Sequence, residues 1–88
     1  MTNVYAVVKV NTEDVDDVDV LEVNKNMTQA IHTIFKDLKT DVSEEQGTAE
    51  IEQALDEDGY VLNSEIKETE TGRERRVYKY FIRKSEVF

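Results

Sequence analysis

The chain has 88 residues, which suits one domain with a small core, and no cysteine, which excludes disulfides and thiolate metal sites. Its formal net charge of −9 disfavours binding of nucleic acid or an anionic membrane through the main surface and favours a basic partner. The sequence shows neither a basic leader with an apolar run nor a membrane-spanning stretch, so a cytoplasmic protein is expected.

The charge is unevenly distributed along the chain. Residues 13–70 hold eighteen acids and four lysines, whereas residues 73–88 hold six bases and two acids. Like charges repel one another in a compact domain, so this acid load indicates either a solvating role or a partner of opposite charge. The alternative explanation of the acid load is that it serves only to keep the protein soluble.

Two β-strands are expected first. Residues 4–10 alternate β-branched side chains, and residues 18–23 resume that pattern after a polar, acidic connection over residues 11–17. A calcium loop that began at Asp14 would have an aspartate where glycine belongs and a lysine where the closing glutamate belongs, so no metal site is expected. The acids of this region are instead candidates for contact with a basic partner: Asp14, Asp16, Asp17 and Asp19.

Residues 26–42 show the strongest helical pattern. Asn26 can cap the helix, and Gln29 occupies the reciprocal position of a capping box. His32, the only histidine, lacks the neighbours that a general base or a metal site needs, so an exposed side chain without a role is expected. A wide apolar stripe predicts that this helix lies across the sheet and supplies most of the core: Met27, Ala30, Ile31, Ile34, Phe35, Leu38 and Val42.

A second helix is predicted within the acidic residues 41–58. Ser43 begins a capping box, S-E-E-Q, and Gly59 is a good left-handed terminator. Gly47 is a weak point at which the helix could restart. Ile51, Ala54 and Leu55 are expected to face inward. The outward acids form the main candidate surface for a basic partner: Glu45, Glu52 and Asp56, flanked by Glu50 and Glu57.

The rest of the chain is predicted to form a hairpin, with strands at residues 60–70 and 73–85 and a turn at Thr71 and Gly72. That turn would set Ile66 opposite Val77 and Leu62 opposite Phe81. The other face of the hairpin is also apolar, and one helical layer cannot cover both faces. We therefore expect a homodimer interface, with a half-exposed sheet face as the alternative, formed by Val61, Tyr78, Tyr80 and Ile82.

The elements together predict a two-layer α+β domain of order β-β-α-α-β-β, with both helices on one face of an antiparallel sheet. Acids in the patterns D-V-D-D-V-D and S-E-E-Q…D-E-D, in a short chain without cysteine or proline, resemble small early proteins of lytic bacteriophages. This resemblance implies inhibition of a host DNA-binding protein by DNA mimicry, as in inhibitors of the histone-like HU protein.

No catalytic motif occurs in the sequence, and neither an enzyme nor a cofactor is expected. Direct nucleic-acid binding by the basic, aromatic residues 73–84 is disfavoured, because acids of the facing strand neutralise much of their charge. The favoured interpretation is an acidic module that occupies the basic surface of a DNA-binding protein. The alternative is a dimeric structural or regulatory protein whose acidity serves solubility.

Overall fold

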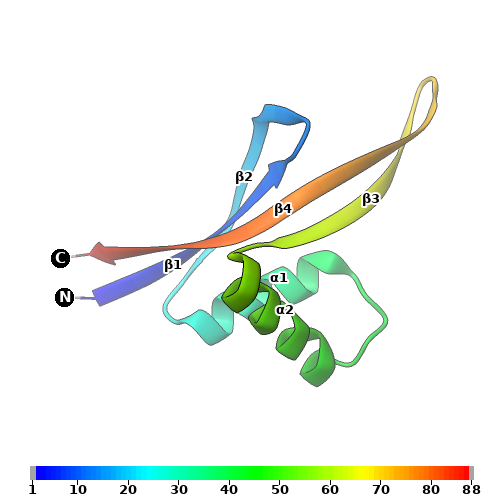
Figure 1. The fold of residues 1–88 in the computed structure, drawn as a ribbon. Helices are drawn as coiled ribbons and strands as arrows, with labels where there is room; N and C mark the ends of the chain where they lie inside the picture. Colours follow the sequence, from blue (N-terminus) through cyan, green and yellow to red (C-terminus); the bar gives the residue numbers. More distant parts are fainter. Residues whose placement is uncertain (1, 88) are drawn as a thin grey trace.

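The computed structural model describes residues 2–87, apart from the side chain of Val15. The chain forms β1 (Thr2–Asn11), β2 (Asp14–Asn24), α1 (Met27–Leu38), α2 (Glu44–Asp58), β3 (Val61–Thr69) and β4 (Gly72–Val87). The four strands make one antiparallel sheet, and both helices lie on the same side of it (Figure 1). The predicted fold class and order of elements are confirmed.

The strand order is β2-β1-β4-β3, so the first and last strands of the chain pair at the centre of the sheet. The 16-residue β4 pairs its second half with β1 and its first half with β3, and only Tyr78, Lys79 and Tyr80 have partners on both sides. The β1–β2 and β3–β4 hairpins consequently diverge beyond this crossing, away from the helices (Figure 1).

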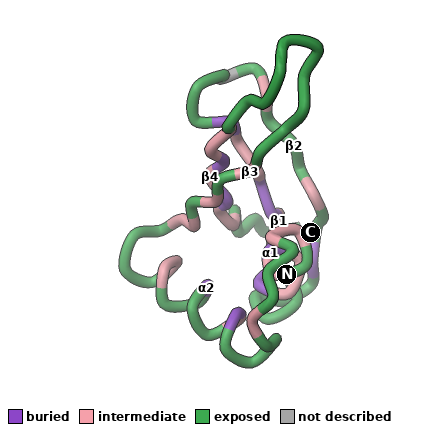
Figure 2. Tube along the Cα trace, turned by 90° about the vertical axis from the view of Figure 1, so that its right-hand side faces the viewer, coloured by how far each residue is buried: buried purple, intermediate pink, exposed green. Residues whose placement is uncertain are grey.

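The core lies between the helices and the middle of the sheet. Val7 and Tyr80 are fully buried there beneath Ile34 of α1 and Ile51 of α2. Burial is concentrated where the strands cross, whereas both hairpin tips are exposed (Figure 2). Ala30, Ile31 and Ile34 are the fully packed part of the stripe predicted for α1, and Met27 is exposed.

Local sequence determines where the helices begin and end. The side chain of Asn26 accepts a hydrogen bond from the Gln29 amide at 2.9 Å, and that of Ser43 accepts one from the Gln46 amide at 3.2 Å. The left-handed Gly59 (φ 83°) ends α2 and donates to the Leu55 carbonyl, as expected. Helix α1 ends at Leu38, earlier than the predicted Val42, because Lys39 adopts the left-handed conformation.

Gly47 is not a weak point, and the predicted restart of the helix is wrong. Helix α2 runs unbroken through Gly47, which is buried against α1. A Cβ at this position would overlap the Phe35 ring. The missing side chain therefore allows α1 and α2 to approach closely, and this gain in packing offsets the low helix propensity of glycine.

The predicted hairpin register is also wrong, by two residues. The turn residues are Glu70 and Thr71, so Leu62 pairs with Lys79 and Ile66 pairs with Arg75. A shift of two residues leaves every side chain on its predicted face, because side chains alternate with period two. In the other hairpin, β2 begins at Asp14 rather than Val18, with irregular pairing where it meets the end of β1.

Candidate functional surfaces

The outer side of α2 carries the acids that the sequence singled out, and we call Glu45, Glu50, Glu52, Asp56 and Glu57 the acidic face. All five residues are exposed, and α2 contains seven acids and no lysine or arginine. Neighbouring glutamines donate hydrogen bonds to Glu50 and Glu57 at 3.2 and 3.1 Å. Within residues 2–87, no member of the acidic face forms an ion pair.

The aspartates of β2 form a separate acidic region. They lie at the exposed end of the β1–β2 hairpin, whereas α2 lies at the opposite end of the molecule (Figure 1). Part of this group shapes the strand itself: Asp14 accepts from the Asp16 amide at 3.0 Å, and Asp17 accepts from the Asn11 side chain at 3.3 Å. The structure therefore does not join the two predicted acidic groups, and only the acidic face lies on a rigid helix.

His32 has a structural contact, so the prediction that it has no role is wrong. Its Nδ1 lies 2.7 Å from Oε1 of Glu44, in the first turn of α2. The pair links α1 to α2 at the surface. Sequence analysis could not have found it, because the loop between the helices determines which turn of α2 comes near His32.

A charged cluster that the sequence analysis missed connects the sheet to α1. Nζ of Lys9 lies 3.0 Å from Asp37 and 2.9 Å from Glu65, and 4.4 Å from the centre of the Tyr78 ring. The Tyr80 hydroxyl donates to the same Asp37 oxygen at 2.5 Å. Lys9 thereby joins β1 to α1 on one side and to β3 on the other.

The electrostatics of this cluster favour a structural role. Burial opposes the charge of Lys9, but the hydrogen bonds to Glu65 and Asp37 outweigh it and raise the lysine pKa above its ordinary value. Burial likewise opposes ionisation of Asp37, but the bonds from Tyr80 and Lys9 outweigh it and lower the pKa of that carboxyl. Burial and the bond to Asp37 raise the pKa of Tyr80. Each group is thus held in its usual charge state, which suits a fixed contact rather than proton transfer.

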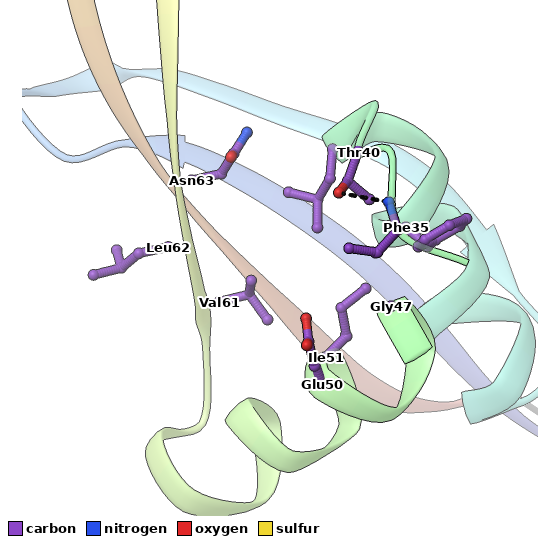
Figure 3. Close-up of a pocket in the computed structure, with 10 residues that line it drawn as sticks. Phe35, Thr40, Gly47, Glu50, Ile51, Val61, Leu62 and Asn63 are labelled. Atoms are coloured by element: carbon purple, nitrogen blue, oxygen red, sulfur yellow. Dashed lines mark hydrogen bonds between the residues drawn. The ribbon is translucent and has the colours of Figure 1, made fainter. Parts of the chain in front are cut away.

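A small pocket of about 250 Å³ opens between α1, α2 and β3 (Figure 3). Its lining is mainly apolar, with Phe35 and Ile51 from the helices and Val61 from β3, and Glu50 is its one carboxylate. Val61 and Asn63 lie on the helix side of β3, whereas Leu62 points to the opposite side of the strand (Figure 3). The pocket is smaller than typical ligand sites of about 300–1,000 Å³.

The predicted dimer surface is wrong, because its residues belong to the core. Tyr78 and Tyr80 are only 4% and 0% exposed, and Val61 and Ile82 pack against the same cluster beneath the helices. Both faces of the β3–β4 hairpin are apolar, so the alternating pattern alone could not show which face the helices cover. The structure places the helices over the tyrosines.

The uncovered side of the sheet is consequently also apolar. Val20 and Val23 of β2 are 61% and 58% exposed, and Leu62 and Ile66 of β3 are 55% and 69% exposed. Strand pairing puts these side chains on one surface, since directly opposite residues of an antiparallel pair share a face. We define this open sheet face by its apolar members, of which Val8 is already buried at 9% exposure: Val4, Ala6, Val8, Val10, Val18, Val20, Val23, Leu62, Ile66, Val77 and Phe81.

The described residues show neither a metal site nor a membrane-spanning helix. No three histidine, cysteine, aspartate or glutamate residues of this part of the chain are grouped so as to hold a metal ion. Neither α1 nor α2 is long and apolar enough to cross a membrane. Comparison with models of known protein families, with curated proteins and with solved structures finds no match.

Proposed function

We propose that this protein is a binding module whose acidic face occupies the basic, DNA-binding surface of another protein, in the manner of a DNA mimic. One observation carries the proposal: α2 presents five exposed carboxylates on a capped helix, and no cation of the described chain is paired with them. The phage resemblance makes the histone-like HU protein of a bacterial host cytoplasm the first candidate partner.

Order is what distinguishes such a surface from a solvated acidic tail. Helical geometry places Glu45 and Glu52, two turns apart, about 10.5 Å from each other. Duplex DNA carries about one charge per 1.7 Å of its axis, and its binding proteins hold lysines and arginines against that array. A partner could place the same cations against the fixed carboxylates of α2 without first ordering a flexible segment.

The acidic face also has few competing cations nearby. Residues 25–60, which include both helices, contain nine acids and three lysines. The electrostatic potential on this side of the molecule is therefore negative, which accelerates encounter with a basic protein and makes binding sensitive to salt.

Two variants with equal charge test the proposal. E45Q/E52Q/D56N neutralises three carboxylates of the acidic face, and D14N/D16N/D19N neutralises three on the β1–β2 hairpin. Wild type and the hairpin variant should capture basic DNA-binding proteins from a bacterial lysate at low salt and release them to duplex DNA. The α2 variant should bind at least about 30-fold more weakly, on the basis of roughly 0.7 kcal/mol for each lost ion pair.

The two variants have the same net charge, so general electrostatic attraction would weaken both equally. Equal losses would therefore contradict a role for α2 in particular. Capture that duplex DNA does not reverse would contradict mimicry.

A further inference from the structure

We infer that the pocket between α1, α2 and β3 receives one apolar side chain of the basic partner, while cations beside that side chain pair with Glu50 and Glu57 of the acidic face. The inference rests on the proposed function, because it names a second feature that the partner must offer. Its occupant is an apolar wedge of the kind that many minor-groove DNA-binding proteins, which also carry lysines and arginines, insert between base steps.

The pocket exists because α2 leaves the second half of the apolar stripe of α1 partly uncovered. The first half of the stripe is buried in the core, whereas Phe35, Leu38 and Val42 are only partly buried and line the pocket. Val61 of β3 contributes another wall (Figure 3). Apolar side chains that face water in a concavity gain free energy when a side chain of a partner covers them.

The volume of the pocket suits one side chain. At about 250 Å³ it is smaller than the usual sites for whole ligands, which span about 300–1,000 Å³. An engineered apolar cavity of about 150 Å³ binds benzene in another protein, so a phenylalanine ring or a branched aliphatic side chain fits in this pocket. Aromatic side chains buried in such pockets commonly anchor protein interfaces.

The charge beside the pocket favours a basic partner. Glu50 is the one charged residue of the lining, and no cation of residues 2–87 forms an ion pair with it. Glu57 lies two turns further along the same side of α2, about 10.5 Å away. A side chain that enters the pocket therefore brings its neighbours close to these carboxylates. Lysine or arginine is favoured there, whereas a second copy of this acidic chain is repelled.

A nuclear magnetic resonance titration of the full chain with three pentapeptides at low salt tests the inference. The probes are Lys-Arg-Phe-Arg-Lys, the same peptide with alanine in place of phenylalanine, and a neutral peptide with serine in place of all four cations. The basic phenylalanine peptide should shift the methyl signals of Val42, Ile51 and Val61. It should bind at least about 10-fold more tightly than the alanine peptide, because only its ring fills the pocket.

The neutral peptide should also bind at least about 10-fold more weakly than the basic phenylalanine peptide, because it forms no ion pairs with α2. E50Q/E57Q should correspondingly weaken both basic peptides. These comparisons separate the apolar contact from the charged one.

A matched pair of variants tests whether the pocket itself is the site. Asn63 lines the pocket from β3 and is partly buried. Asn63→Phe should fill the pocket with its own ring and abolish the difference between the two basic peptides, whereas Asn63→Ser leaves the pocket open and should preserve that difference. The comparison of peptides on the wild type needs no variant, so a variant that fails to fold cannot hide the result.

The possible failures are distinguishable. Equal affinities of the two basic peptides for the wild type, with shifts confined to α2, would overturn the inference and leave the proposed role of the acidic face intact. A neutral peptide that binds as tightly as the basic one would also overturn it, since the pocket would then act independently of the acidic face. Absence of binding by all three peptides at several millimolar would contradict both proposals.

Discussion

Lys9 shows at the level of single residues how a small domain with few buried side chains holds its helices in place. Its ammonium group joins Asp37 of α1 to Glu65 of β3, and Tyr80 bonds to the same aspartate from β4. Four elements thus meet at one partly buried cluster. Loss of one member would leave its opposite charge without a full set of partners, which costs more than an exposed ion pair contributes.

Asp37→Asn should lower the free energy of unfolding by about 1 kcal/mol at neutral pH, allowing for the partial exposure of the pair. The pKa of Asp37 is lowered in the folded state from its ordinary value of 3.8. Its stabilising contribution is therefore complete above that value and is lost as the pH falls through the lower pKa of the folded protein. Urea unfolding from pH 7 to pH 2.5 should show the difference between wild type and variant shrinking below about pH 4.

Asp41→Asn is the matched control, because Asp41 is an exposed acid of the loop between the helices. It removes one negative charge without touching the cluster, so its stability should follow that of the wild type across the pH range. A deficit of Asp37→Asn that persisted unchanged in acid would show that the contact does not depend on ionisation of Asp37.

The contact between α1 and α2 depends on one glycine. Gly47 allows the Phe35 ring to lie against the backbone of α2. In an isolated helix the same glycine would be unfavourable by about 1 kcal/mol relative to alanine. Packing between elements therefore decides the identity of this residue.

Gly47→Ala should destabilise the protein by about 1–2 kcal/mol, because displacement of the Phe35 ring outweighs the gain in helix propensity. The same change in a Phe35→Leu background should be neutral or stabilising, since the ring atoms that the new Cβ would meet are gone. Urea unfolding of the four proteins measures the coupling between the two sites. An increase in stability from Gly47→Ala alone would show that the ring yields without cost.

Sequence patterns predicted the elements well, because strands, helices and caps depend on neighbouring residues. Asn26, Ser43 and Gly59 act where local rules place them. Contacts distant in sequence were not predictable in this way. Lys9 meets its partners 28 and 56 residues away, and a periodic pattern carries no information about such pairs.

The candidate site residues show the same difference between features that depend on neighbouring residues and features that depend on distant ones. The outward position of Glu45, Glu52 and Asp56 followed from helical periodicity, and the structure shows all three exposed. The covered face of the sheet could not be predicted, because tyrosines on one side of β4 and apolar residues on the other gave equally good patterns. The position of the helices resolves this ambiguity, because it places the tyrosines of β4 in the core.

On the scale of the whole molecule, the acidic face and the open sheet face lie in different layers. The first belongs to α2, and the second is the side of the sheet that the helices leave uncovered.

The central claim is that the acidic face and duplex DNA compete for one basic surface. The most direct measurement is the fluorescence anisotropy of a labelled duplex bound to purified HU protein, as this protein is added at low salt. The account predicts that anisotropy falls to the value of free duplex, with E45Q/E52Q/D56N requiring at least about 30-fold more protein than the wild type. Anisotropy that stays constant, or rises because all three molecules form one complex, would contradict it.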